Sequence, residues 1–277
     1  MDLRSNFVQL LTEDRSDIEW QKASADLPHL RIICEDGDKR SFTYNVQVHM
    51  EKEYQICYSS LQPVQFVPSV PLDRDFAKYR VVELLDHMTT YKYIEGIENR
   101  LSTQSLSKSF NARMYMSDDE KSRSTENCVL EVTVGQEFTF EIINLSEDVL
   151  HIYLYALRPD WSIVDQLTEF RSTERVELGP VYCRFKTTFK ATLSQNFPSD
   201  HVTSEDEVFK LFVTRRADSF AGLRMDALSS SPRRGTLNTL KDFLAARRDR
   251  RRGGSDSDHE EEWFTKNFIV KTKAVST

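Results

Sequence analysis

Four cysteines and six histidines are the residues of this 277-residue chain that could carry nucleophilic or metal chemistry. A catalytic cysteine needs a neighbouring base and a setting that favours the thiolate. The cysteines stand instead among bulky apolar residues in predicted strands, at Cys34, Cys57, Cys128 and Cys183. No two histidines have the spacing of metal ligands. We therefore expect buried, reduced thiols, with no catalytic residue, no metal and no cofactor.

Other motifs that would carry chemistry are missing from the sequence. It contains no GxxxxGK, GxGxxG, HExxH or CxxC pattern. Asp36, Gly37 and Asp38 lack the downstream oxygen ligands of a calcium loop, so a tight turn is expected there. The acidic triplets at 118–120 and 205–207 are interpreted as solvated loops. No residue set amounts to an active site.

One segment departs from the rest in charge. Residues 232–252 hold eight Lys or Arg and two Asp, and residues 255–262 hold five acids. Three interpretations remain open: a solvated insertion, a nuclear-import or nucleic-acid patch, or an amphipathic docking helix for a protein partner. The candidate partner-binding residues combine an apolar stripe with a basic cluster: Leu237, Leu240, Phe243, Leu244, Arg247, Arg248, Arg250, Arg251 and Arg252. Ser231, which precedes Pro232, is a candidate phosphorylation site.

Composition narrows the class of protein. The net charge of −7 gives the whole molecule no attraction for nucleic acid or an acidic membrane. The 17 Phe and 10 Tyr indicate a sizeable core. No apolar stretch reaches the length of a membrane span, and the N-terminus lacks the apolar core of a signal peptide. We expect a cytoplasmic location, with a nuclear one as the alternative.

Alternation of apolar and polar residues predicts mostly strands. A hairpin is expected from 30–34 and 41–50, turning at 35–39, with a third strand at 53–58. Residues 73–99 carry apolar residues at helical spacing and predict one long helix. No parallel α/β pattern is expected before the sandwich. Further strands are predicted at 109–116, 128–134, 137–144, 149–157, 161–167, 181–193 and 207–214, with a last one in 263–277.

These elements predict a mainly β fold: an antiparallel, immunoglobulin-like β-sandwich with one long packed helix. The expected parts are a tail or short helix at 1–29, strands and the helix at 30–116, a polar loop at 117–127, the sandwich core at 128–222, a partly disordered charged insertion at 223–262 and the last strand. Leu154 and Phe189 are expected in the core, and Leu211 is expected to be more deeply buried than Phe212.

Three blocks of the sequence occur in a recognisable order: EFTFEIINLSED, VLHIYLYALRPDWSIVDQL and DEVFKLFVTRRADSF. Over roughly 30–220 and 263–274 the chain resembles the β-rich accessory region that follows the caspase-like peptidase domain in fungal proteins. The resemblance rests on packing motifs, and it implies an accessory sandwich rather than the peptidase itself.

The expected function is a non-enzymatic interaction or regulatory module with a protein partner, which the resemblance suggests is a caspase-like peptidase. One alternative is a part of a caspase-like cysteine peptidase whose catalytic domain lies elsewhere. Another is a nucleic-acid-binding or nuclear protein that uses 232–252, although nucleic acid is the less favoured partner. No membrane association is expected.

Overall fold

The computed structural model describes residues 6–14, 18–27, 29–33, 42–50, 52–98, 104–116, 129–168, 175–193, 204–217, 220, 223–228 and 263–274. The chain forms two compact units. Unit 1 comprises Met1–Ile94 and Asp226–Thr239, and unit 2 comprises Glu95–Met225 and Leu240–Thr277. Each unit is described by itself.

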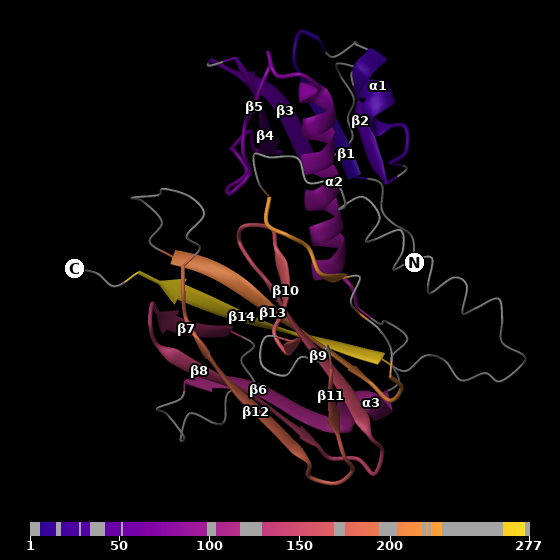
Figure 1. Ribbon diagram of the computed structural model, residues 1–277, viewed down its shortest axis with the longest axis vertical. Coiled ribbons are helices and arrows are strands. Elements are labelled where there is room, and N and C mark those ends of the chain that lie inside the picture. Colours follow the sequence, from indigo (N-terminus) through magenta and orange to yellow (C-terminus); the bar gives the residue numbers. More distant parts are fainter. Residues whose placement is uncertain are drawn as a thin grey trace, which may run out of the picture. The chain divides into compact units, whose positions relative to one another are not determined.

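Unit 1 is built on a five-stranded mixed sheet in the order β2-β1-β3-β4-β5. Its elements along the chain are β1 (Asn6–Leu11), α1 (Ile18–Ser24), β2 (Leu30–Ile33), β3 (Tyr44–His49), β4 (Glu53–Tyr58), β5 (Val70–Pro71) and α2 (Ala77–Glu95, whose last residue falls in unit 2) (Figure 1). β1 pairs in parallel with both β2 and β3, whereas β3, β4 and β5 pair antiparallel.

This arrangement corrects two expectations about the N-terminal region. The short helix expected within 1–29 is present as α1, but residues 6–11 form a strand rather than a tail, and Val8, Leu10 and Trp20 are buried. β2 and β3 are not partners in a hairpin, because β1 lies between them. A parallel β1-α1-β2 unit therefore precedes the sandwich, contrary to expectation. The long helix is confirmed as α2, four residues shorter at each end than the predicted range 73–99.

The described residues of unit 2 form one short helix and two β-sheets. Its elements are α3 (Gln104–Lys108), β6 (Phe110–Met116), β7 (Val129–Thr133), β8 (Glu137–Asn144), β9 (Leu150–Leu157), β10 (Ile163–Asp165), β11 (Val176–Leu178), β12 (Arg184–Lys190), β13 (Ser204–Thr214) and β14 (Trp263–Lys273). One sheet has the order β12-β8-β6. The other has the order β10-β9-β13-β14-β7, and β11 also pairs with β9.

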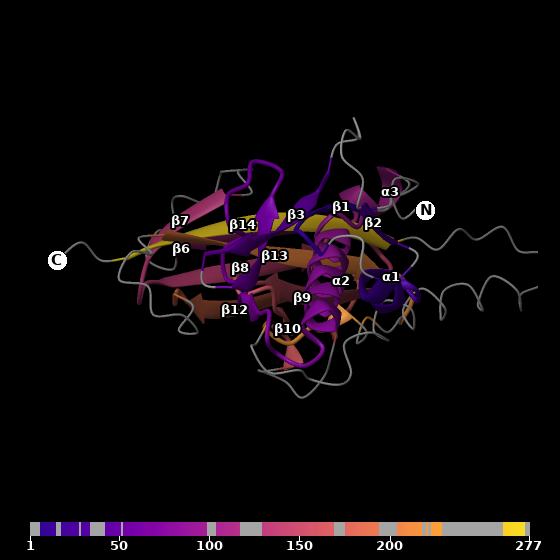
Figure 2. The same cartoon turned by 90° about the horizontal axis from the view of Figure 1, so that it is seen from above.

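The two sheets of unit 2 pack face to face through one apolar core. The larger sheet supplies buried residues such as Leu154, Leu211 and Val270, and the smaller sheet supplies Phe140 and Phe185. The alternation of residues along β12 decides which of its side chains face the core. Phe185 and Phe189 are buried, while Arg184, Lys186 and Lys190 are exposed. Figure 1 shows β6, β8 and β12 as one layer and β9, β13 and β14 as the other. Seen from above, the strands of both layers run in similar directions (Figure 2).

Unit 2 therefore confirms the predicted fold class, a mainly β, immunoglobulin-like sandwich. Its pairing is antiparallel except between β14 and β7, which is parallel. The short elements β5, β11 and α3 were not expected from the sequence, because two to five residues carry too little periodic pattern to identify.

The larger sheet is also covered on its second face, by aromatic side chains. Phe212 packs against Tyr155, Phe220 and Trp263, with ring centroids 4.8–6.3 Å apart. The Tyr155 hydroxyl donates to the carbonyl oxygen of Phe220 at 3.0 Å. Leu211 and Phe212 are thus both fully buried, on opposite faces, and the expected difference in their burial is wrong.

Candidate functional site

Asn144, at the end of β8, joins two loops of the sandwich from a fully buried position. Its side-chain amide donates to the carbonyl oxygens of Asp148, Leu178 and Gly179 at 2.7–3.2 Å. Its side-chain oxygen accepts from the amide and the hydroxyl of Ser146 at 2.9 and 2.8 Å. One side chain therefore fixes the β8–β9 loop (145–149) to the β11–β12 loop (179–183).

Backbone hydrogen bonds continue this connection between the loops. The Val181 amide donates to the carbonyl oxygen of Ser146 at 2.8 Å, and the Tyr182 amide donates to that of Asn144 at 2.7 Å. The Asn144 amide in turn donates to the carbonyl oxygen of Cys183 at 2.9 Å. Tyr182 and Cys183 thus both face Asn144, which is the two-against-one arrangement of a β-bulge.

Val181 and Tyr182 adopt left-handed backbone conformations, with φ of 48° and 63°. This region is unfavourable for residues with a Cβ, and most of all for a β-branched residue such as valine. The hydrogen bonds to Ser146 and Asn144 hold both residues there. Val181 is 53% exposed and Tyr182 is 73% exposed, so the strained backbone presents two apolar side chains to solvent. Such local strain is typical of sites with a function.

The same two loops expose two further apolar residues, Leu145 and Val149. We call Leu145, Val149, Val181 and Tyr182 the apolar tip. The β8–β9 loop is anchored at its other side by an ion pair of 3.0 Å between Arg215 and Asp148. The apolar tip is therefore a set of exposed apolar side chains on loops that are fixed by buried and charged contacts.

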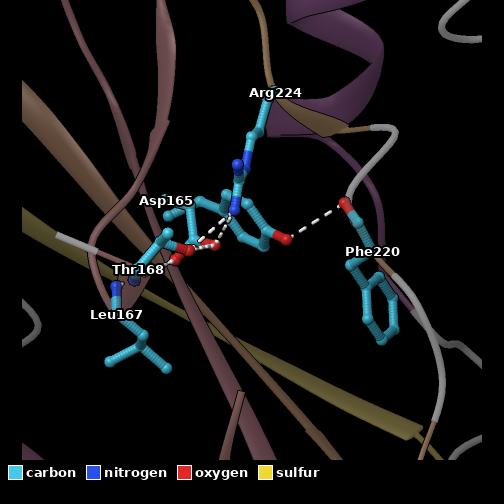
Figure 3. A network of polar contacts seen from close by, with 6 residues as sticks. Asp165, Leu167, Thr168, Phe220 and Arg224 are labelled. Atoms are coloured by element: carbon cyan, nitrogen blue, oxygen red, sulfur yellow. Dashed lines mark hydrogen bonds and ion pairs between the residues drawn. The ribbon is translucent and has the colours of Figure 1, made fainter. Parts of the chain in front are cut away.

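A second polar network surrounds the buried carboxylate of Asp165, at the end of β10 (Figure 3). Its two oxygens accept hydrogen bonds from the amides of Leu167 and Thr168, from the Thr168 hydroxyl and from the Arg224 guanidinium. Arg224 also donates to the Thr168 hydroxyl at 2.7 Å. With four donor contacts, two to each oxygen, the carboxylate is well satisfied, which suits a structural anchor for residues 223–225.

A buried lysine stands on the outer face of β13. Lys210 has no solvent exposure, and its Nζ donates to the carbonyl oxygen of Glu95 at 2.8 Å and to Asn267 Oδ1 at 3.2 Å. Burial lowers the pKa of Lys210 to about 8, although the Glu98 and Glu95 carboxylates favour its charged form. The ammonium is held by a backbone carbonyl and an amide, an arrangement that serves to fix residues 95–98 on the sheet.

Several acidic side chains lie near the start of β13. Burial raises the pKa of Glu207 to about 6; Asp160 and Glu205 act in the same direction, while Arg158 opposes them with a contact of 3.2 Å. Glu205 is itself buried, and it belongs to β13, which begins at Ser204. The interpretation of 205–207 as a solvated loop is therefore wrong. No group of acidic, histidine or cysteine residues that could hold a metal occurs in the described parts of the chain.

The described cysteines are Cys57, which is buried, and Cys183, which is partly buried, and both are free thiols. Burial raises the pKa of the Cys57 thiol, which disfavours the thiolate that catalysis would need. Cys34 and Cys128 lie outside the described residues. His151 lies on β9 with its Nδ1 3.7 Å from a Glu177 carboxylate oxygen.

The sequence-predicted binding residues cannot be placed, because Ser231 and the whole set from Leu237 to Arg252 lie outside the described residues. The apolar tip was missed by sequence reasoning. Residues 181–193 were expected to form one continuous strand, whereas the strand begins at Arg184 and Val181 and Tyr182 belong to the turn. One signal in the sequence could have indicated this surface: Gly179 and Pro180 predict a turn, and two large apolar residues follow them directly. Residues in a turn are exposed, so these two apolar side chains are expected at the surface.

No family model matches the chain, and no curated protein matches it. Among solved structures it is similar to the ASH/PapD-like domain of human CEP192 (PapD-like domain 7), at 12% identity and a TM-score of 0.27, over 66% of this chain and 92% of that one. It is also similar to the CARDB domain of the PF1109 protein from Pyrococcus furiosus, solved in complex with di-metal ions, at 10% identity and a TM-score of 0.23, over 60% of this chain and 94% of that one. With TM-scores this low, the fold stands on the strands and core described above.

None of the described helices is both long and apolar enough to cross a membrane.

Proposed function

We propose that this chain is a non-enzymatic protein-interaction module that binds its partner through the apolar tip. The observation that carries the proposal is the pair Val181 and Tyr182, which are exposed apolar residues held in a strained conformation. Exposed apolar area costs free energy in water, about 25 cal/mol per Å² relative to a buried state. A partner that covers these side chains gains that free energy on binding. The loops lose little conformational entropy when they bind, because Asn144 already fixes them.

The proposed partner is a caspase-like peptidase domain. The support for this choice is the sequence resemblance of the blocks at 137–148, 149–167 and 206–220 to the accessory region that follows such a peptidase in fungal proteins. In this proposal the sandwich contributes binding or regulation while the partner contributes the chemistry. A reducing compartment suits the free thiols of Cys57 and Cys183.

Site-specific photo-crosslinking tests both the surface and the partner. A photoreactive phenylalanine replaces Tyr182 in the full chain, and a purified caspase-like peptidase domain is offered as the binding partner. The matched control places the same residue at Tyr58, which is also an exposed tyrosine and which ends strand β4 of unit 1. We expect a crosslinked product from position 182 and not from position 58.

The affinity of the same pair is measured for Tyr182→Ser and Tyr58→Ser. Tyr182→Ser should weaken binding by at least about tenfold, which corresponds to about 1.4 kcal/mol, and Tyr58→Ser should leave it unchanged. Equal crosslinking from both positions, or equal affinity of both variants and the unmodified chain, would refute the apolar tip as the binding site. A failure to bind the peptidase, in the presence of another ligand that crosslinks at 182, would refute the partner alone.

A further inference from the structure

The strand β12 lies at the edge of its sheet. In the part of the chain that the structure describes, β12 pairs with β8 and with no other strand on its opposite side. An edge strand presents unpaired backbone N–H and C=O groups, which can pair with a strand of another chain.

The hydrogen bonds at the two ends of β12 show which residues turn these groups outward. The Ala191 amide donates to Gln136 and its carbonyl accepts from Gly135, both at 2.9 Å, and the carbonyl of Cys183 accepts from Asn144 at 2.9 Å. In an antiparallel pair such residues alternate with residues whose backbone groups point away from the partner strand. The outward groups along β12 are therefore those of Arg184, Lys186, Thr188 and Lys190.

The same residues carry the positive charge of this edge. Arg184, Lys186 and Lys190 are exposed, since Phe185 and Phe189 between them face the core. On the outer face of this sheet their neighbours are Arg113, which pairs with the buried carboxylate of Glu141, and Tyr115, whose ring lies 5.8 Å from the Lys186 ammonium. Arg184 also reaches Glu141, at 3.3 Å.

Glu141 is thus shared by two guanidinium groups, and it lies beneath the surface with 3% of its side chain exposed. The outer face of β6, β8 and β12 has four basic residues, Arg113, Arg184, Lys186 and Lys190, and two acidic ones, Glu137 and Glu141. An incoming strand meets an excess of positive charge, and this excess lies along the edge itself.

We propose that β12 binds an extended acidic segment of a partner protein, which joins the three-stranded sheet as an additional strand. Backbone groups of Arg184, Lys186, Thr188 and Lys190 pair with the segment. Its side chains on the outer face are acidic at alternate positions, opposite the basic residues, and its other side chains are apolar and extend the core beside Phe185 and Phe189. The charge also excludes a second copy of β12, because two such edges repel each other.

This inference extends the proposed interaction function to a second surface, and it rests on that function only in assigning a protein as the ligand. β12 follows the apolar tip directly in the chain, so one partner can occupy both. The test uses a peptide and needs no identified partner, so its failure and the failure of the apolar tip are distinguishable.

The probe is a fluorescent peptide of alternating glutamate and valine, titrated against the full chain and followed by anisotropy. The controls are a peptide of alternating lysine and valine and a peptide of the first composition with a proline at its centre. We expect binding of the acidic peptide only. Its dissociation constant should rise with salt, since exposed charges are screened.

Two variants separate strand addition from general charge attraction. The double substitution Lys186→Glu and Lys190→Glu should weaken binding of the acidic peptide by at least about tenfold and allow binding of the lysine peptide. Thr188→Pro keeps every charge but removes one outward N–H, which an edge strand tolerates, and should weaken binding to a similar extent. A cooperative thermal unfolding transition is the control that shows whether both variants are folded.

Tyr182→Ser should leave peptide binding unchanged, because the apolar tip lies outside β12. The proposal is overturned if the acidic peptide does not bind the unmodified chain. It is also overturned if two other affinities equal that of the acidic peptide for the unmodified chain: the affinity of the acidic peptide for Thr188→Pro, and the affinity of the proline-containing peptide for the unmodified chain. That second outcome would show charge attraction without strand addition.

Discussion

Lys210 and Glu95 are joined by a hydrogen bond of 2.8 Å from the lysine ammonium to the glutamate's backbone carbonyl oxygen. The lysine comes from the centre of β13, and Glu95 opens unit 2 of the chain. A second contact, from the Thr265 hydroxyl to the carbonyl oxygen of Ile97, holds the same segment on the neighbouring strand β14. Residues 95–97 of unit 2 are thus held on β13 by a buried lysine and on β14 by a threonine hydroxyl.

Replacement of Lys210 by methionine should remove a pH dependence of stability. The pKa of Lys210 is about 8 in the folded chain, below its ordinary value of 10.5. Between these values the unfolded chain binds the proton that the folded chain has released, so stability rises with pH across this window. The lysine should contribute a rise of up to about 3 kcal/mol. Urea unfolding at several pH values checks this, and parallel profiles for Lys210→Met and the unmodified chain would contradict it.

Glu207→Gln should stabilise the chain at neutral pH. The folded pKa of Glu207, about 6, lies above its ordinary value of 4.5, so its stabilising effect is present at acid pH and is lost as the pH rises through that window. Because 24% of the side chain is exposed and Arg158 loses a partner, we expect a gain of only about 1 kcal/mol at pH 7. Glu131→Gln is the control, since Lys273 lowers the pKa of Glu131 and the pH dependence should have the opposite sign.

Asn144→Ala should be strongly destabilising. The substitution removes a fully buried side chain that makes hydrogen bonds to both loops, and it leaves the carbonyl oxygens of Leu178 and Gly179 without their donor. The expected cost is about 2–4 kcal/mol in the free energy of unfolding. Asn111→Ala, at an exposed position of β6, should change stability by less than about 0.5 kcal/mol. Similar effects for the two asparagines would show that Asn144 does not anchor the loops.

Val181→Gly should stabilise the chain although it removes an apolar side chain. Glycine adopts a positive φ without the steric cost that valine pays at 48°, and the expected gain is about 1 kcal/mol. Val149→Gly is the matched control, because Val149 is similarly exposed but has no positive φ. It should be neutral or destabilising. Thermal unfolding of the two variants separates strain from side-chain loss, and a loss of stability in Val181→Gly would argue against strain.

Phe212→Ala should cost at least as much stability as Leu211→Ala. Both residues are fully buried, Leu211 in the sandwich core and Phe212 among the rings of Tyr155, Phe220 and Trp263. Typical costs are about 3–5 kcal/mol for a buried phenylalanine and about 2–5 kcal/mol for a buried leucine. Chemical denaturation measures both. A neutral Phe212→Ala would show that the second face of the sheet is open to solvent.

The sandwich could be predicted from the sequence because most of its strands bury one face. β12 shows this best: its apolar residues alternate with charged ones, and the structure buries Phe185 and Phe189 as expected. β9 was expected at the centre of a sheet because it is apolar on both faces, and it is fully buried between β10 and β13. α2 was predicted from its helical spacing.

The errors arise where contacts between distant residues decide the structure. β1 was not predicted, because its role depends on parallel pairing with β2 and β3, which a six-residue segment does not reveal. Phe212 was taken to be less buried than Leu211, because its cover comes from Phe220 and Trp263, residues outside the strand. Val181 continues the apolar alternation of Cys183 and Phe185, so periodicity alone extends β12 into the turn that holds Val181 and Tyr182.

The position of β14 has a consequence for the order in which the sandwich is completed during synthesis. β14 lies between β13 and β7, and it pairs with β13 along all eleven of its residues. Residue Ile269 pairs with Val129, which the ribosome has released long before. Until residues 263–273 emerge, β7 lacks its partner and one edge of β13 is unpaired, so a nascent chain exposes an aggregation-prone strand. Slow, late closure of the sheet is expected for pairings of such long range.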